Sequence, residues 1–276
     1  MKAILVPVEP HPAIASVLDA ALVVARRFGG TIEGFALRPA PVEYVPIDMI
    51  GGLAWHVDER ADRNAAADAR ALFERHMADR EVPRAGGEAP GFRWYDEAPA
   101  GDAFAGSRAR VFDLTVLGRP DKDPGAPRLS TLETVLFESG RPILIAPRSV
   151  PTSLGETIVI AWNGSTETAR AAAFAMPFLR EAGRVVVLTV EGGSVPGPTG
   201  EEMSRSLRLN GIAAEPMRVK SDRRSTGEAF LATADSLGCD LLVKGAYTQS
   251  RLRQMIFGGA TSHILAAATV PVLMAH

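Results

Sequence analysis

The sequence predicts an α/β fold of two tandem Rossmann-like domains, each with a five-stranded parallel sheet between layers of helices. Short β-branched and apolar runs alternate along the chain with longer stretches whose apolar residues recur at helical spacing. Some runs are apolar at nearly every residue, as in 184–190, which indicates strands buried on both faces and therefore parallel sheets covered by helices. The same order of segments also occurs twice, which predicts two domains.

The repeat rests on four pairs of corresponding segments. Segments 3–9, 13–28, 113–118 and 141–147 match 157–163, 166–181, 240–245 and 270–276 in type and in order. We therefore expect one domain over residues 1–148, a second over 154–276 and a short linker between them. This duplication is a stronger signal than any single motif in the chain.

In the first half, β-branched and aromatic residues predict strands at 3–8, 31–37, 91–95, 113–117 and 142–146. Helices are expected between them at 13–28, 57–79, 102–110 and 129–138. The first helix ends at Gly29-Gly30, and Ser130 with Glu133 resembles a capping box at the start of the fourth. A proline-rich and aromatic insertion at 39–56 predicts a loop that covers the carboxyl edge of the sheet.

In the second half, the same pattern predicts strands at 157–162, 184–190, 213–219, 240–244 and 271–275. Helices are expected at 166–181, 199–210, 226–237 and 251–268. Gly183 and Asn210-Gly211 follow two of these helices, as residues that end helices commonly do. The last strand of each half is apolar, and an apolar edge strand is usually covered or paired.

Composition narrows the function classes. Hydrophobic residues make up 46% of the 276 and charged residues 22%, the profile of a folded globular protein. A net charge of −2 argues against general binding to nucleic acid or to an anionic membrane. The apolar run at the start is too short for a signal sequence, and no stretch reaches the roughly 18 apolar residues of a membrane span. We expect a cytoplasmic protein, with Cys239 as a buried, unreactive thiol.

The segment after the strand at 240–244 is the candidate ligand site. Gly245-Ala246-Tyr247-Thr248 is followed after nine residues by Gly258-Gly259-Ala260-Thr261, where a helix begins. Ligands of open α/β sheets bind at the carboxyl ends of strands, and glycines there allow a backbone to approach a phosphate closely. The alternative is that these glycines only permit tight turns between the strand and the helix.

Two five-stranded βα units with glycines spaced in this way resemble the universal stress protein family over nearly the whole chain. The resemblance implies the adenine nucleotide alpha hydrolase-like form of the Rossmann fold. Nucleotide-binding members carry Gly, two residues, Gly, nine residues, Gly and then Ser or Thr. Here Thr248 occupies the position of the second Gly, and Gly259 occupies the position of the Ser or Thr, so the motif is incomplete.

The resemblance implies ATP or AMP as the cofactor, bound in the C-terminal half only. The expected nucleotide-binding residues are Ala161, Asn163, Val190, Lys244, Gly245, Gly258, Gly259, Ala260 and Thr261. Asn163 stands where the family has an acidic residue; its amide can bond a ribose hydroxyl but gives no charge to a cation, which argues against a magnesium requirement. For Asn163 and Ser165, a cap or turn role at the helix 166–181 is an equal alternative. Val190 is expected beside the adenine or, equally, in the core.

The first half is expected to be degenerate for nucleotide and mainly structural. Its loop after the strand at 113–117 is broken by prolines, and Glu9 follows its first strand. The family's last strands pair across a dimer interface, so the resemblance implies that the two halves form an intrachain pseudo-dimer, with a homodimer as a further option.

Three functions remain open at this point. The first is a stress-response or regulatory module that binds adenine nucleotide. The second is an interaction or scaffold protein of the same fold without nucleotide, and the third is a weak ATPase. The sequence contains no recognisable catalytic constellation and no metal-ligand spacing among its five histidines, so an efficient enzyme is not expected.

Overall fold

The computed structural model describes residues 1–39, 59–86, 90–121, 123, 125–149, 153–246 and 259–276. The N-terminal half contains β1 (Ala3–Val8), α1 (Ile14–Phe28), β2 (Thr31–Ala36), α2 (Glu59–Asp79), β3 (Gly91–Tyr95), α3 (Asp102–Arg108), a 3₁₀ turn (Ala109–Val111), β4 (Leu114–Leu117), α4 (Leu129–Glu138) and β5 (Ile143–Ile145). The C-terminal half contains β6 (Thr157–Ala161), α5 (Thr166–Glu181), β7 (Arg184–Val190), α6 (Gly200–Leu209), β8 (Ala214–Val219), α7 (Thr226–Ser236), β9 (Leu241–Gly245), α8 (Gly259–Ala267) and β10 (Val272–Ala275).

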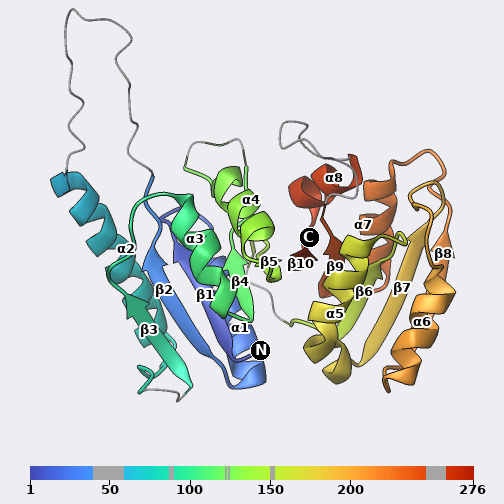
Figure 1. The fold of residues 1–276 in the computed structure, drawn as a ribbon, viewed down its shortest axis with the longest axis horizontal. Coiled ribbons are helices and arrows are strands. Elements are labelled where there is room, and N and C mark those ends of the chain that lie inside the picture. Colours follow the sequence, from blue (N-terminus) through green and yellow to red (C-terminus); the bar gives the residue numbers. More distant parts are fainter. Residues whose placement is uncertain (40–58, 87–89, 122, 124, 150–152, 247–258) are drawn as a thin grey trace, which may run out of the picture.

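All ten strands belong to one sheet, with the order β3-β2-β1-β4-β5-β10-β9-β6-β7-β8. Within each half the five strands are parallel and have the same relative order. At the centre of Figure 1, β5 and β10 pair in antiparallel fashion, with Leu144 opposite Leu273. The expected α/β fold with parallel sheets is confirmed. The last strands of the two halves cover each other's edge, and this pairing joins the two five-stranded sheets into one.

Helices cover both faces of the sheet. One core cluster joins the strands to apolar residues of α1, α2, α5 and α6. A second cluster, on the opposite face, contains residues of α3, α4, α7 and α8. The strands present apolar side chains to both faces, which explains why they are continuous apolar runs in the sequence.

Local signals end or begin several of these helices. Gly29 terminates α1 in the left-handed conformation, at φ 59°, which glycine adopts without strain. Capping boxes start α6, between Thr199 and Glu202, and α7, between Ser225 and Glu228. These reciprocal bonds satisfy backbone N–H groups that would otherwise have no partner in the helix.

The capping box expected at Ser130 and Glu133 is wrong. Helix α4 begins at Leu129, its N-cap is Arg128, and no side chain caps it. The Thr131 hydroxyl instead donates to Asp102 of α3 across 2.7 Å. A tertiary contact between two helices therefore replaces the local cap.

The two halves also meet away from the β5–β10 pair. Arg27, at the end of α1, donates to the carbonyl oxygens of Leu154 (2.5 Å) and Glu181 (2.9 Å) and to a Glu181 carboxylate oxygen (3.0 Å). Beside it, the rings of Phe28 and Phe178 pack edge to face with centroids 4.9 Å apart. Helix α1 is thus joined to the C-terminal half by both polar and apolar contacts.

Two expectations fall partly outside the described residues. Helix 251–268 is described as α8 from Gly259 only, and of the insertion 39–56 only residue 39 is described. None of the helices in the described part of the chain combines the length and apolar character needed to cross a membrane.

Candidate functional site

Lys244 is the central residue of the candidate site. It lies in β9, one residue before the strand ends, and only 8% of it is exposed. Its Nζ donates to the carbonyl oxygen of Gly245 (2.9 Å) and to Oγ1 of Thr261 (2.8 Å). These two bonds link the carboxyl end of β9 to the first turn of α8.

The buried ammonium of Lys244 is electrostatically uncompensated. Burial lowers its pKa from the ordinary 10.5 to about 8. Among the residues that the structure describes, no carboxylate forms an ion pair with it. A negatively charged group at this position would stabilise the protonated amine and raise its pKa.

Asn163 and Ser165 organise the start of α5. The Ser165 hydroxyl accepts from the Thr168 backbone N–H (3.2 Å) and is the N-cap of the helix. Oδ1 of Asn163 accepts from the Thr168 hydroxyl (2.7 Å) and from the Ser165 N–H (3.2 Å). The cap and turn roles proposed for these two residues are therefore observed.

Gly245 lets α5 approach the end of β9. A Cβ at this position would lie 2.3 Å from the Thr168 nitrogen and 2.5 Å from the Glu167 carbonyl carbon. Both of these are backbone atoms, which cannot give way as the end of a side chain can. The glycine thus serves packing between the strand and the helix, and it brings the Asn163–Thr168 pair next to the Lys244–Thr261 pair.

The remaining expected site residues are spread over the same half. Ala161 and Val190 are buried in the core cluster on the α7 and α8 face. Gly259 and Ala260 are the first residues of α8, and Gly258 lies outside the described residues. The structure therefore brings Asn163, Lys244, Gly245 and Thr261 to one edge of the sheet.

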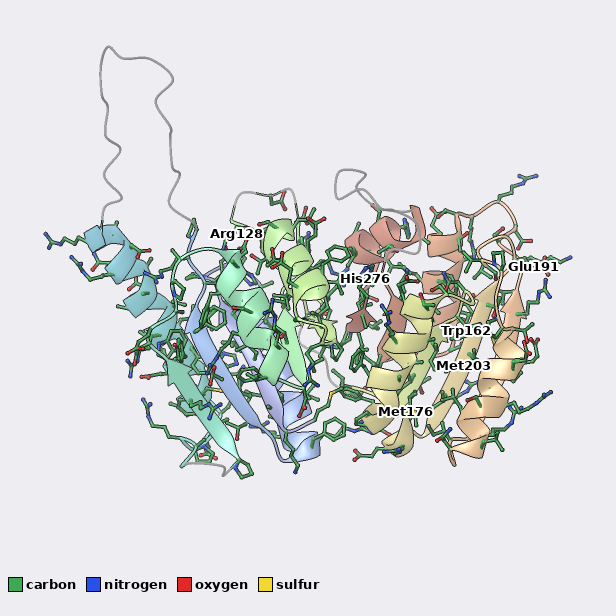
Figure 2. The ribbon with its side chains drawn as sticks, in the orientation of Figure 1. Arg128, Trp162, Met176, Glu191, Met203 and His276 are labelled. Atoms are coloured by element: carbon green, nitrogen blue, oxygen red, sulfur yellow. The ribbon has the colours of Figure 1, made fainter. Side chains whose placement is uncertain are left out.

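The corresponding edge of the N-terminal half is filled by an internal cation. Arg128 forms ion pairs with Glu9 (3.0 Å) and Asp102 (3.3 Å). Figure 2 shows Arg128 at the upper side of the view, near the start of α4. Burial raises the pKa of Glu9, an effect that the charge of Arg128 opposes. Neither Arg128 nor Asp102 was recognised from sequence, since nothing local marks them as partners of Glu9.

Other reactive groups do not gather at the edge site. Cys239 is buried, and burial raises its pKa to about 11, so the thiol stays protonated and unreactive at neutral pH. In the described parts of the chain, no three His, Cys, Asp or Glu side chains are grouped so as to hold a metal ion.

The architecture and the edge site together define a doubly wound α/β protein, a class whose ligands bind at the carboxyl ends of the strands. By sequence, residues 155–276 match the model of the universal stress protein family. This sequence match covers most of the C-terminal half and none of the N-terminal half. No curated protein matches the chain.

Solved structures extend the likeness to the whole chain. A universal stress protein from Archaeoglobus fulgidus DSM 4304 is 17% identical, with a TM-score of 0.72 over 99% of this chain and 97% of that one. A putative universal stress protein from Pseudomonas aeruginosa UCBPP-PA14 is 13% identical, with a TM-score of 0.55 over 100% and 93%. A functionally unknown protein from Pseudomonas aeruginosa PAO1 is 14% identical, with a TM-score of 0.54 over 100% and 92%. At these identities the likeness establishes the fold of the full chain.

Proposed function

We propose that the chain is a tandem universal stress protein, a cytoplasmic stress-response or regulatory module that binds ATP or AMP in its C-terminal half. The observation that carries this proposal is the uncompensated buried ammonium of Lys244, held next to the start of α8. The family match over residues 155–276 supports it independently.

The residues at this edge fit the phosphate part of a nucleotide. Lys244 has a third N–H and a full charge to offer, and the Thr261 hydroxyl, which accepts from Lys244, can itself donate. The first backbone N–H groups of α8 have no partners within the helix and favour an anion. Asn163 would act indirectly, by holding the start of α5 beside Gly245.

Binding is tested on protein purified without added nucleotide. Mass spectrometry of the released small molecules, followed by calorimetric titration with ATP and AMP, identifies the ligand and its affinity. Lys244→Met should weaken binding by about tenfold or more, because a charge-assisted contact to phosphate is lost. Lys220→Met, which removes an exposed lysine just after β8, is the matched control and should bind as the wild type does.

A nucleotide-free interaction module is the second candidate. Two observations favour it: Gly245 is already required by α5, and Oδ1 of Asn163 is already bonded to Thr168. If no nucleotide is released and millimolar ATP gives no thermal shift, this second function replaces the first. ATP turnover that disappears in Lys244→Met would instead support the weak ATPase.

A further inference from the structure

A pocket of about 280 Å³ opens between α7 and α8, beside the amino ends of β9 and β10. The two helices pack against each other in the C-terminal half (Figure 1), and the pocket lies toward their C-terminal ends. Its walls are mostly small apolar side chains, including Ala232, Ala268 and Val270. The Lys244 site is at the other end of β9, so the two sites are separate. The volume lies near the lower limit for ligand pockets and fits a small organic molecule.

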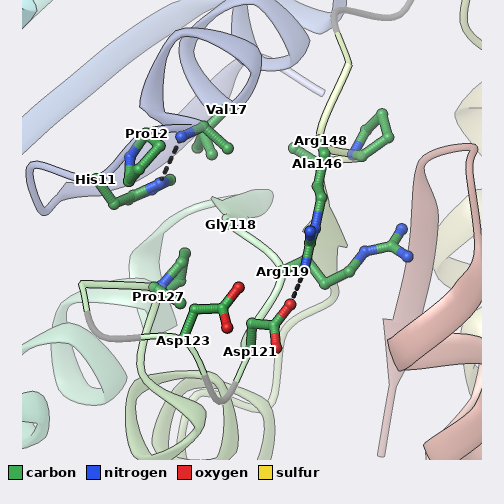
Figure 3. A pocket seen from close by; sticks show the side chains of 13 residues that line it. His11, Pro12, Val17, Gly118, Arg119, Asp121, Asp123, Pro127, Ala146 and Arg148 are labelled. Carbon is green, nitrogen blue, oxygen red and sulfur yellow. Dashed lines mark hydrogen bonds and ion pairs between the residues drawn. The ribbon is translucent and has the colours of Figure 1, made fainter.

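The surroundings of this pocket favour a positive charge. Asp235 is the one charged side chain among the described residues of its lining, and it is exposed and without an ion pair in the described part of the chain. Helices α7 and α8 both end here, and the carbonyl groups at a helix C-terminus carry partial negative charge. Among the described residues, no backbone N–H donates to the carbonyl oxygens of 265–267 in α8. By contrast, the pocket in Figure 3, at the carboxyl ends of β4 and β5, is lined by Arg119 and Arg148.

The corresponding place in the N-terminal half is filled by a side chain of the protein itself. In the repeat, Asp113 corresponds to Asp240, so Phe112 has the position of Cys239. The Phe112 side chain is only 3% exposed and belongs to the core cluster of the α3 and α4 face. An aromatic ring therefore occupies this place in one half, where the smaller thiol leaves a pocket in the other.

Positive charges accompany the ring of Phe112. The guanidinium of Arg108, at the sequence position that corresponds to Asp235, lies 5.7 Å from the ring centre. Nε of Arg110 donates to the carbonyl oxygen of Glu138 at the end of α4 (3.0 Å). A cation thus meets a helix C-terminus in the N-terminal half, as the helix dipole favours. The lining of the C-terminal pocket contains no such cation among the described residues and has an acid at the position of Arg108.

We infer that this pocket binds a small organic cation, an ammonium group on an aromatic or aliphatic body. The body takes the place that Phe112 has in the other half and packs against Cys239 and Val270. The ammonium group lies near the carboxylate of Asp235 and the carbonyl end of α8. The ligand thereby supplies the apolar bulk and the positive charge that the N-terminal half carries in its own chain. The inference is independent of nucleotide binding.

The test uses benzylamine, which is protonated at neutral pH, with benzyl alcohol and benzoate as neutral and anionic controls of similar size. Binding to the full chain is measured by NMR titration at low salt, and benzylamine should bind more tightly than either control. Asp235→Asn should weaken benzylamine binding by about two- to fivefold, the range for an exposed ion pair, and should leave the binding of the alcohol unchanged. Asp68→Asn, the same change at an exposed position of α2, should bind as the wild type does.

A second test fills the pocket. Cys239→Phe introduces the residue that the N-terminal half has at this position, and it should abolish benzylamine binding. Should that variant not fold, Ala232→Leu enlarges an exposed residue of the lining and should abolish binding in its place. Binding of benzylamine no tighter than that of the alcohol or of benzoate, or undiminished binding in Asp235→Asn or in the folded pocket-filling variant, would overturn the inference. Lys244→Met should bind benzylamine normally, and a loss there would place the amine at the nucleotide site instead.

Discussion

The Nζ atom of Lys244 donates a 2.8 Å hydrogen bond to Oγ1 of Thr261, and this bond ties the end of β9 to the first turn of α8. The two residues are 17 positions apart, and residues 247–258 between them lie outside the described residues. The amine therefore fixes the position of a helix start by a tertiary contact, while its charge has no partner among the described carboxylates. Because the Lys244 amine positions the start of α8 and has no counter-charge among the described residues, an anionic ligand that pairs with it could also order the start of this helix.

Lys244 should make stability depend on pH. The unfolded chain keeps this proton up to the ordinary pKa of 10.5, whereas the folded chain releases it near 8. Between these values the unfolded state binds more protons, so the free energy of unfolding should rise with pH, by up to about 3 kcal/mol. Urea unfolding from pH 7 to 10 measures the rise, and it should be missing in Lys244→Met. Parallel pH profiles of the two proteins would show that Lys244 is not the buried titrating group.

Gly245 and Gly259 should respond differently to alanine, although both belong to the same glycine motif. Gly245→Ala would push a methyl group into the backbone of Glu167 and Thr168 and should destabilise the protein by about 1–3 kcal/mol. A Cβ on Gly259 meets no atom of the described residues within 4 Å, so Gly259→Ala should change stability by no more than about 0.5 kcal/mol. Thermal unfolding of the two variants measures both changes in stability. An equally small loss of stability in both would mean that the packing of α5 does not need the glycine at position 245.

Much of the fold is readable from the sequence because its strands are buried on both faces. Each of the ten predicted strands lies within one or two residues of the observed strand, as with 184–190 and Arg184–Val190. Helix caps are less secure: α4 begins at Leu129 as predicted, but no side chain caps it, and Thr131 donates to Asp102 instead. That contact joins two helices, and no local pattern encodes it.

The candidate site is only partly readable for a similar reason. The glycine spacing points to Gly245 and Thr261, and Lys244 is expected as a basic residue beside the loop. Hydrogen bonds of Lys244 join the three residues in space. The glycine spacing could not show that Gly245 is required by α5, nor that Arg128 pairs with Glu9 across the N-terminal edge. Ion pairs between residues of different helices and strands depend on how those elements pack together. No local sequence pattern predicts that packing.

Arg27 should strengthen the link between the two halves. Its three hydrogen bonds to Leu154 and Glu181 are made by a side chain that is only 15% exposed. Arg27→Met should lower the free energy of unfolding by about 2 kcal/mol, since the carbonyl groups of Leu154 and Glu181 lose a charged donor. The neighbouring Arg26→Met removes a single exposed bond to Arg80 and is the control. Urea denaturation measures both, and equal small effects would mean that the β5–β10 pair and apolar contacts alone hold the halves together.

Asn163→Asp should test why this chain has an amide where the universal stress protein family has an acid. A carboxylate can accept from the Thr168 hydroxyl and the Ser165 N–H just as Oδ1 of Asn163 does, so the start of α5 should be preserved. The added negative charge near a helix N-terminus should stabilise the fold by about 0.3–1 kcal/mol. It also provides an anionic oxygen ligand of the kind that Mg²⁺ prefers. Calorimetric titration with ATP, with and without Mg²⁺, should therefore give a Mg²⁺-dependent affinity in Asn163→Asp and a Mg²⁺-independent one in the wild type. If the wild type already required Mg²⁺, the ion would have to be held by the nucleotide and residues other than Asn163, and the amide would have only its structural role at α5.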